Sequence, residues 1–167
     1  MKIININGPI NSGKTTISRL LAQNLSGVLF IEVDDLLSDD EQKALGLSVR
    51  EGWVERVNRL AKIVAEEKKL KRYENIIFAY PITEKLYNQW NLWQDATTEF
   101  INITLVPQQE ICLQNRGNRE LSEYEKNRIN EMYRQGYHNF KFADLIIDNS
   151  KQTPQETLRR ILQFLQK

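Results

Sequence analysis

The sequence predicts an α/β fold in which a parallel sheet carries helices on both faces. Two observations support it: five short apolar runs, rich in β-branched and aromatic residues, recur along the chain, and longer segments of helical period separate them. Repeated strand–helix–strand units require right-handed crossovers, which connect parallel strands. The 167 residues, of which 41% are hydrophobic, favour one globular domain spanning residues 1–167.

Local signals place the individual elements. A Ser or Thr followed three residues later by Glu marks a helix start as a capping box. The longest helix is predicted over residues 49–71, with Trp53, Val57, Leu60 and Val64 in its apolar stripe. The expected strands are 3–6, 28–33, 76–80, 100–106 and 145–147. The capping boxes are Ser48 with Glu51, Ser122 with Glu125 and Thr153 with Glu156, and the glycines expected to end helices are Gly27, Gly117 and Gly136. Three aromatic residues at helical spacing should pack in the core: Tyr87, Trp90 and Trp93.

Composition narrows the classes of partner. The chain has 23 Lys+Arg against 22 Asp+Glu, and its net charge of +1 lacks the basic excess of a dedicated nucleic-acid binder, so we do not expect a nucleic-acid partner. The single cysteine, Cys112, cannot form an internal disulfide, which favours a reducing compartment. No apolar run reaches the roughly 18–20 residues that span a bilayer, and Asn5 and Asn7 interrupt the N-terminal apolar stretch. We therefore expect a cytoplasmic protein with no membrane partner.

Residues 8–15, GPINSGKT, match the phosphate-loop pattern G-x-x-x-x-G-K-[ST] at every fixed position. The match follows an expected strand and precedes a segment of helical period, as the pattern requires. Gly8 and Gly13 allow the backbone to approach a phosphate, while Lys14 reaches the β- and γ-phosphates and Thr15 offers its hydroxyl to Mg²⁺. The expected phosphate-binding residues are Gly8, Asn11, Ser12, Gly13, Lys14, Thr15 and Thr16.

Other sequence features favour a small-molecule or nucleotide kinase. The chain lacks the Asn-Lys-x-Asp and Asp-x-x-Gly patterns of GTPases, and no acid ends the third strand as in mechanical ATPases. Asp34 follows the second strand, whose carboxyl end should lie beside the phosphate loop. Asp34 could accept the proton of an acceptor hydroxyl or bind Mg²⁺ through water. Asp35 is the alternative, and it could instead cap a helix that begins near Leu36.

Arg116 and Arg119 are the expected cations that close over the transferred phosphoryl group. Gly117 between them would let a lid segment, about 114–136, move. The competing interpretation is an ordinary basic helix end. For Arg128 and Arg134, solvated ion pairs are expected.

These residues together resemble the nucleoside-monophosphate-kinase-like superfamily, nearest its chloramphenicol phosphotransferase-like and shikimate kinase-like branches. The resemblance is carried by Asn7-Gly8, Val33-Asp34, Trp90, the pair Arg116 and Arg119, and residues 143–150. It implies a three-layer P-loop NTPase fold with sheet order 2-3-1-4-5 and a helical lid. It also implies that Asp34 is the acceptor-side base and that Asn149, Ser150 and Gln152 line the adenine.

Some features depart from these relatives. Antibiotic-modifying members carry acids where this chain has Phe78 and Ala79, and the arginines and Gly-Gly pair of shikimate kinases are not found. Asp39, Asp40 and Glu41 would favour a cationic or polyhydroxylated acceptor, unless they form a solvated turn.

The expected function is ATP- and Mg²⁺-dependent transfer of the γ-phosphoryl group to a small hydroxyl- or phosphate-bearing acceptor, by a monomer or homodimer. The alternatives are a nucleotide-binding regulatory or interaction protein without transfer activity, and a kinase of nucleic-acid 5′ ends.

Overall fold

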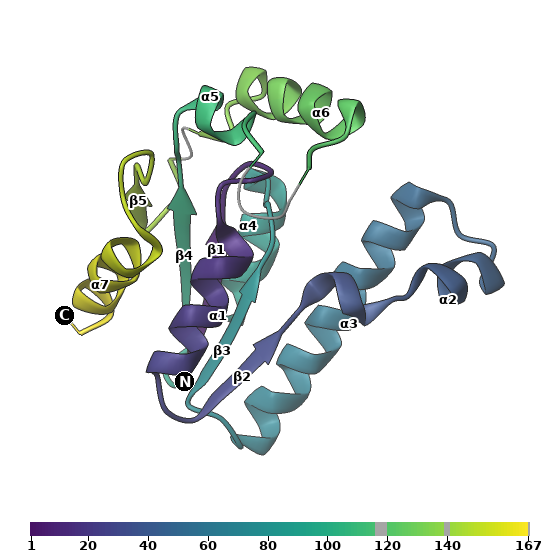
Figure 1. Cartoon of the computed structure of the whole chain (residues 1–167). Coiled ribbons are helices and arrows are strands. Elements are labelled where there is room, and N and C mark those ends of the chain that lie inside the picture. Colours follow the sequence, from purple (N-terminus) through teal and green to yellow (C-terminus); the bar gives the residue numbers. More distant parts are fainter. Residues whose placement is uncertain (116–119, 139–140, 167) are drawn as a thin grey trace.

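Five parallel strands form one sheet in the order β2-β3-β1-β4-β5, which confirms the predicted fold class and strand order (Figure 1). This computed structural model describes residues 1–115, 120–138 and 141–166. The strands are β1 (Lys2–Asn7), β2 (Val28–Ile31), β3 (Asn75–Ala79), β4 (Glu99–Leu105) and β5 (Leu145–Ile147). The helices are α1 (Lys14–Asn24), α2 (Asp39–Ala44), α3 (Val49–Leu70), α4 (Glu84–Trp90), α5 (Gln109–Cys112), α6 (Glu123–Arg134) and α7 (Pro154–Leu165).

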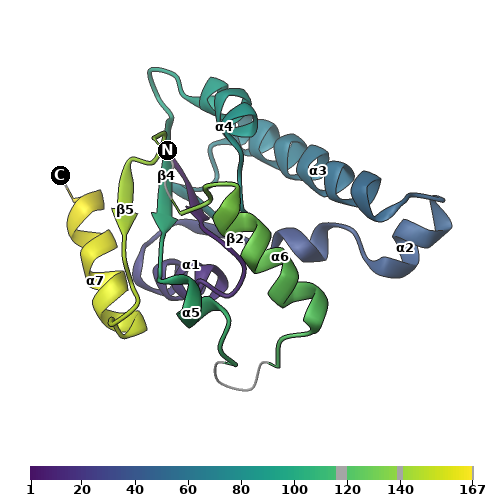
Figure 2. The same ribbon diagram turned by 90° about the horizontal axis from the view of Figure 1, so that it is seen from above.

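Alternation along the strands builds two separate cores, one on each face of the sheet. On one face Ile4 and Ile6 pack with α1 and α7, and on the other Ile3 packs with α3 and α4 (Figure 2). Slipping β1 by one residue would exchange the two sets, so the pattern specifies its register. Buried residues of the first core include Ile17, Leu21, Ile77, Ile103 and Ile161, and those of the second include Leu60, Val64, Ile76, Phe78, Trp90 and Phe100.

The end of the second strand differs from the prediction. β2 stops at Ile31, and residues Val33–Leu36 form a 3-10 turn in which the Asp35 N–H donates to the Glu32 carbonyl at 3.2 Å. The interpretation of Asp35 as the N-cap of a helix that begins near Leu36 is therefore wrong. Helix α2 begins at Asp39, and the Ser38 hydroxyl caps it by accepting the Glu41 N–H. The pairing of β2 with β3 ends at Ile31 and Phe78, and the side chains of Ile31 and Val33 are both buried in the core on the α3 and α4 face.

The helix starts are confirmed, because all three capping boxes are present. Helix α3 ends at Leu70, and Lys71 adopts a left-handed conformation (φ 51°) at its C-cap. Gly27 and Gly136 follow helices with positive φ, whereas Gly117 lies outside the described residues. The prediction for Trp53 is wrong: its side chain is 42% exposed, because the amino-terminal half of α3 extends beyond the sheet (Figure 1).

Helices α5 and α6 lie beyond the carboxyl ends of the strands, above the loop that follows β1 (Figures 1 and 2). A small third core of Cys112, Leu121 and Ile129 packs them together and also contacts Ile10 of that loop. Within the described ranges, none of the helices is long and apolar enough to cross a membrane.

Candidate active site

The phosphate loop (residues 8–15) joins β1 to α1, and its glycines adopt conformations that other residues avoid. Gly8 has φ 140° and Gly13 has φ 94°. A Cβ atom on Gly8 would lie 2.5 Å from the Leu105 carbonyl oxygen, so this residue lets the loop pass close to the end of β4. Glycine is therefore required at position 8 for two reasons, the positive φ of its backbone and the lack of space for a Cβ atom.

The start of α1 is built to receive an anion. Gly13 occupies the N-cap position and has no side chain to accept the first-turn N–H groups. Thr15 and Thr16 are exposed in that first turn. Unsatisfied N–H groups and the helix dipole place partial positive charge at this point.

Two side chains of the loop bond to the protein itself. Asn11, at φ 62°, donates from Nδ2 to the carbonyl oxygens of Cys112 and Gln114, both at 2.9 Å. Lys14 curls back over the loop and donates from Nζ to the Pro9 carbonyl at 2.7 Å. Asn11 thus ties the loop to α5, a role that the sequence pattern did not indicate, and its contribution to anion binding would come from its main chain.

The loop after β5 meets the phosphate loop through Asn149. The buried Asn149 side chain donates from Nδ2 to the Ser12 carbonyl at 3.0 Å. Among the described residues, Asn149 Oδ1 and Ser12 Oγ are buried polar atoms without a hydrogen-bond partner. By contrast, Ser150 Oγ accepts the Gln108 N–H, and Gln152 Oε1 accepts the Thr157 hydroxyl. Of the three residues expected near the adenine, only Asn149 reaches the phosphate loop.

Asp34 and Asp35 are exposed at the carboxyl end of β2, two strands away from the phosphate loop. Two arginines of α3 hold this segment by its main chain. Arg56 is 7% exposed and donates to the carbonyls of Asp34 (3.3 Å) and Leu37 (2.7 Å). Arg59 donates to the Leu36 carbonyl at 2.8 Å and forms an ion pair with Glu41. Sequence reasoning missed both arginines, although their spacing of three residues puts them on one side of a helix.

Tyr80 follows β3 at the same edge of the sheet. Burial, with added repulsion from Tyr137 and Asp34, raises the pKa of Tyr80 to about 12, while Arg56 opposes the shift. The phenol is therefore neutral at physiological pH. Its ring centroid lies 6.2 Å from that of Trp53 and 5.8 Å from that of Trp90. The expectation that Tyr87, Trp90 and Trp93 pack in the core is confirmed, since Trp90 is 3% exposed and stacks on Trp93.

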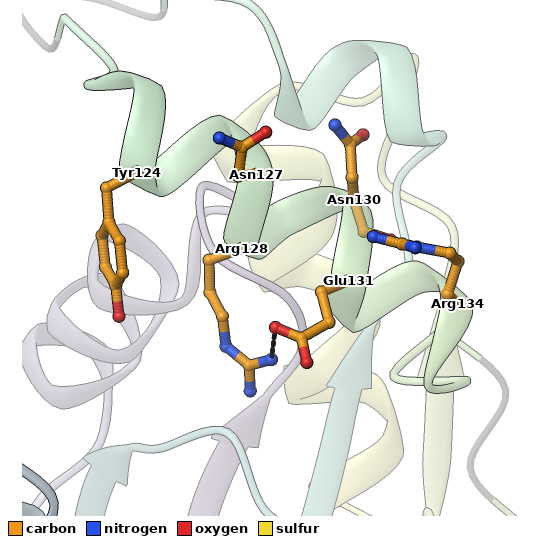
Figure 3. A pocket seen from close by; sticks show the side chains of 6 residues that line it. All are labelled: Tyr124, Asn127, Arg128, Asn130, Glu131 and Arg134. Carbon is orange, nitrogen blue, oxygen red and sulfur yellow. Dashed lines mark hydrogen bonds and ion pairs between the residues drawn. The ribbon is translucent and has the colours of Figure 1, made fainter.

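Helix α6 covers the site from above. Arg128 and Glu131 point to the same side of the helix and form an ion pair at 2.7 Å in a pocket that Tyr124 and Arg134 also line (Figure 3). This pairing agrees with the expectation for Arg128, and Arg134 is exposed. The expected lid cations Arg116 and Arg119 lie outside the described residues.

Comparison with solved structures gives the same fold over nearly the whole chain. A gluconokinase from Sinorhizobium meliloti 1021 aligns with a TM-score of 0.68 at 16% identity, over 99% of this chain and 91% of that one. A sugar kinase from Janibacter sp. HTCC2649 aligns with a TM-score of 0.70 at 16% identity, over 99% and 95%. A shikimate kinase from Bacteroides thetaiotaomicron aligns with a TM-score of 0.62 at 16% identity, over 99% and 98%.

At the level of sequence, no curated protein matches the chain closely. A family model described as "Shikimate kinase" nevertheless matches residues 10–166, from inside the phosphate loop to the end of α7. This range includes Lys14, Asp34 and Asn149. The chain therefore belongs to the shikimate kinase family, and it is a kinase with the P-loop fold.

Proposed function

We propose that this kinase transfers the γ-phosphoryl group of ATP, in the presence of Mg²⁺, to a hydroxyl group of a small acceptor. One observation carries the proposal: the glycine loop after β1 and the exposed Asp34 after β2 open at the same edge of the parallel sheet. In open α/β sheets, ligands bind at this edge.

The chemistry of the donors fits both ATP and Mg²⁺. The loop presents main-chain N–H groups and Lys14 to phosphate oxygens, and the buried, unpartnered Asn149 Oδ1 lies where the loop after β5 meets it. The Thr15 hydroxyl and the Asp34 carboxylate are hard oxygen ligands of the type that Mg²⁺ prefers. When bound, ATP supplies the phosphoryl group and Mg²⁺ offsets part of its negative charge.

The residues of the chain have separate roles in the proposed phosphoryl transfer. The first turn of α1 and Lys14 would hold the β- and γ-phosphates and stabilise the charge that accumulates on them. Asp34 would orient the acceptor and accept the proton from its attacking hydroxyl. Arg116 and Arg119 are proposed to supply further positive charge to the transferred phosphoryl group.

The structural neighbours support a hydroxylated acceptor, because they include a gluconokinase, a sugar kinase and a shikimate kinase. Family membership also favours transfer over the regulatory alternative. We place the protein in the reducing cytoplasm, the compartment that a single cysteine, Cys112, favours.

A pair of variants tests the assignment of Asp34. Asp34→Asn should lower the rate of acceptor-dependent ADP release by about 10²–10⁴-fold, the usual contribution of a positioned base, and should keep most of the ATP affinity. Asp35→Asn, which removes the neighbouring exposed charge, should lose much less. ADP release is measured with hydroxylated acceptors, and ATP binding by calorimetry. An equal loss of ATP binding in Asp34→Asn would assign Asp34 to the metal instead, and a larger loss in Asp35→Asn would exchange the two roles.

A further inference from the structure

An aromatic wall stands beside Asp34, formed by Trp53 of α3 and Tyr80 after β3. The two rings are tilted by 58° with centroids 6.2 Å apart. Trp53 is 42% exposed, while Trp90, which lies behind Tyr80, is almost fully buried. A large, partly exposed indole at the ligand-binding edge offers an apolar face to whatever binds next to Asp34.

The wall is held rigidly from behind. The Asn5 carboxamide accepts the Tyr80 N–H at 3.0 Å and donates to the Tyr80 carbonyl at 3.1 Å, and Asn7 Oδ1 accepts the Ile82 N–H at 3.1 Å. Both asparagines are fully buried. The Arg56 guanidinium lies 5.1 Å from the centre of the Trp53 ring and supports it as a cation–π contact. These contacts fix the main chain of Tyr80 and the indole before any ligand arrives.

Arg56 joins the wall to the segment that carries Asp34, because its guanidinium lies 5.1 Å from the centre of the Trp53 ring and donates to the Asp34 carbonyl at 3.3 Å. Asp34 and Arg56 both act on the pKa of Tyr80, in opposite directions, so the carboxylate, the guanidinium and the phenol are electrostatic neighbours. A hydroxyl positioned by Asp34 would therefore belong to a molecule whose body lies against Trp53 and Tyr80.

The two arginines of α3 that hold the Asp34 segment are engaged with the protein. All three nitrogens of the Arg56 guanidinium donate, to the carbonyls of Asp34 and Leu37 and to Gln42. Arg59 bonds to Leu36, Glu41 and Glu55. Neither therefore presents a two-pronged donor to a carboxylate. Asp39 and Asp40 are paired with Arg56 at 3.8 Å and with Lys43 at 3.9 Å, and the exposed acids Asp34 and Asp35 add negative charge on this side.

From these contacts we infer that the acceptor is an uncharged alcohol with a ring, which packs against the wall of Trp53 and Tyr80 while Asp34 holds its hydroxyl. This inference rests on the proposed function and specifies the acceptor for the same site. It makes Trp53 and Tyr80 the residues that determine acceptor specificity through packing. An anionic acceptor would meet the acids of the 34–40 segment and find Arg56 and Arg59 occupied.

Matched pairs of acceptors test the inference, because the members of each pair differ mainly in a carboxylate. Shikimate is compared with its methyl ester, glucuronate with glucose, and 4-(hydroxymethyl)benzoate with benzyl alcohol, each by ADP release at saturating ATP. In every pair of which the enzyme phosphorylates at least one member, the neutral member should be the better acceptor. Trp53→Ala should raise the acceptor KM about tenfold, as expected for loss of an aromatic stacking contact, with kcat changed far less.

Conservative variants separate stacking from folding. Trp53→Phe and Tyr80→Phe should keep most of the wild-type KM, while Leu92→Ala removes an exposed apolar side chain from the turn after α4 and should change nothing. A saturating acceptor should also shield Trp53 from acrylamide quenching, measured as the fluorescence difference between wild type and Trp53→Phe.

The outcomes distinguish the two proposals. Transfer that prefers the carboxylates, or a KM that is unchanged in Trp53→Ala, would overturn the inference and leave the proposed function standing. If ADP release responded to none of the six acceptors, the proposed function would be overturned, and the inference would fall with it.

Discussion

The phosphate side and the acceptor side of the site are built in different ways. The phosphate loop is one contiguous segment that presents main-chain N–H groups, and its glycines are required by backbone geometry. The acceptor side gathers side chains from three distant segments: the turn at 33–36, helix α3 and the residues after β3. A main-chain site can be recognised from a short pattern, whereas a site made of dispersed side chains exists only after the chain has folded.

Charge also separates the two sides. Lys14 lies over the phosphate loop, whereas the exposed acids from Asp34 to Asp40 lie beyond β2. The net charge of +1 therefore conceals a polarised site. A polyanion is favoured at one end and a group that gives up a proton at the other.

The largest expected effect is on the phosphate side. Lys14→Ala should lower kcat/KM by about 10²–10³-fold, because a preorganised cation at the transferred phosphate is lost. ATP affinity should fall as well, since the same charge binds the ground state. Lys85→Ala on the exposed surface of α4 is the matched control. A Lys14→Ala enzyme with full ATP affinity and full turnover would show that the phosphate-side assignment is wrong.

Alanine substitutions at two glycines compare a position confined by a main-chain atom with a position confined by a side chain. In Gly8→Ala the new methyl group would lie 2.5 Å from the Leu105 carbonyl, a main-chain atom that cannot move aside. Strain at such a position costs about 1–3 kcal/mol, so both stability and ATP binding should fall. In Gly52→Ala the methyl group meets the end of the flexible Gln42 side chain. Alanine has a higher helix propensity than glycine by about 0.5–1 kcal/mol, and this gain should offset much of the energetic cost of that clash.

Thermal unfolding and ATP titration measure both glycine variants. Equal losses in Gly8→Ala and Gly52→Ala would remove the distinction between a glycine confined by a main-chain atom and a glycine that meets a flexible side chain.

A third prediction concerns the sheet beneath the acceptor side. Asn7→Ala leaves the buried Ile82 N–H and the Thr104 hydroxyl without their partner, and should cost about 1–3 kcal/mol of unfolding free energy. Asn75→Ala removes a more exposed bond to the Ser26 carbonyl and should cost less. Urea denaturation compares the two variants. If Asn75→Ala were the more destabilising, the buried asparagines would not be what holds the residues after β3.

The smallest expected effect is at the start of α3, which carries Trp53 and Arg56. Hydrogen bonds from Ser48 lower the pKa of Glu51 below its ordinary value of 4.5. The folded state therefore binds this proton less readily than the unfolded chain, so the contribution to stability is present above pH 4.5 and is lost as the pH falls.

Ser48→Ala should accordingly lower the stability at neutral pH by about 1 kcal/mol, the usual cost of a lost N-cap. The difference from wild type should shrink in acid, as measured by denaturant midpoints at several pH values. A difference that grew as the pH fell would contradict a lowered pKa of Glu51 in the folded state.

Much of the fold followed from local sequence. Apolar runs located all five strands, and capping boxes located three helix starts, because backbone hydrogen bonding and side-chain alternation depend on neighbours along the chain. The end of β2 was missed, since the apolar run continues to Val33 although the pairing with β3 ends at Ile31. Trp53 was placed in the core because periodicity does not show that the start of α3 extends past the sheet.

The loop at residues 8–15 and the helix that follows it were predicted from the sequence alone, because eight contiguous residues encode the turn, the donors and the helix start. The tertiary structure decided the rest. It made the buried Asn5 and Asn7 anchors for the residues after β3, a role that the sequence did not indicate, and it joined Arg56 to the main chain beside Asp34. It also set Trp53 next to Tyr80. No short pattern encodes such contacts, because they depend on how α3 packs across the sheet.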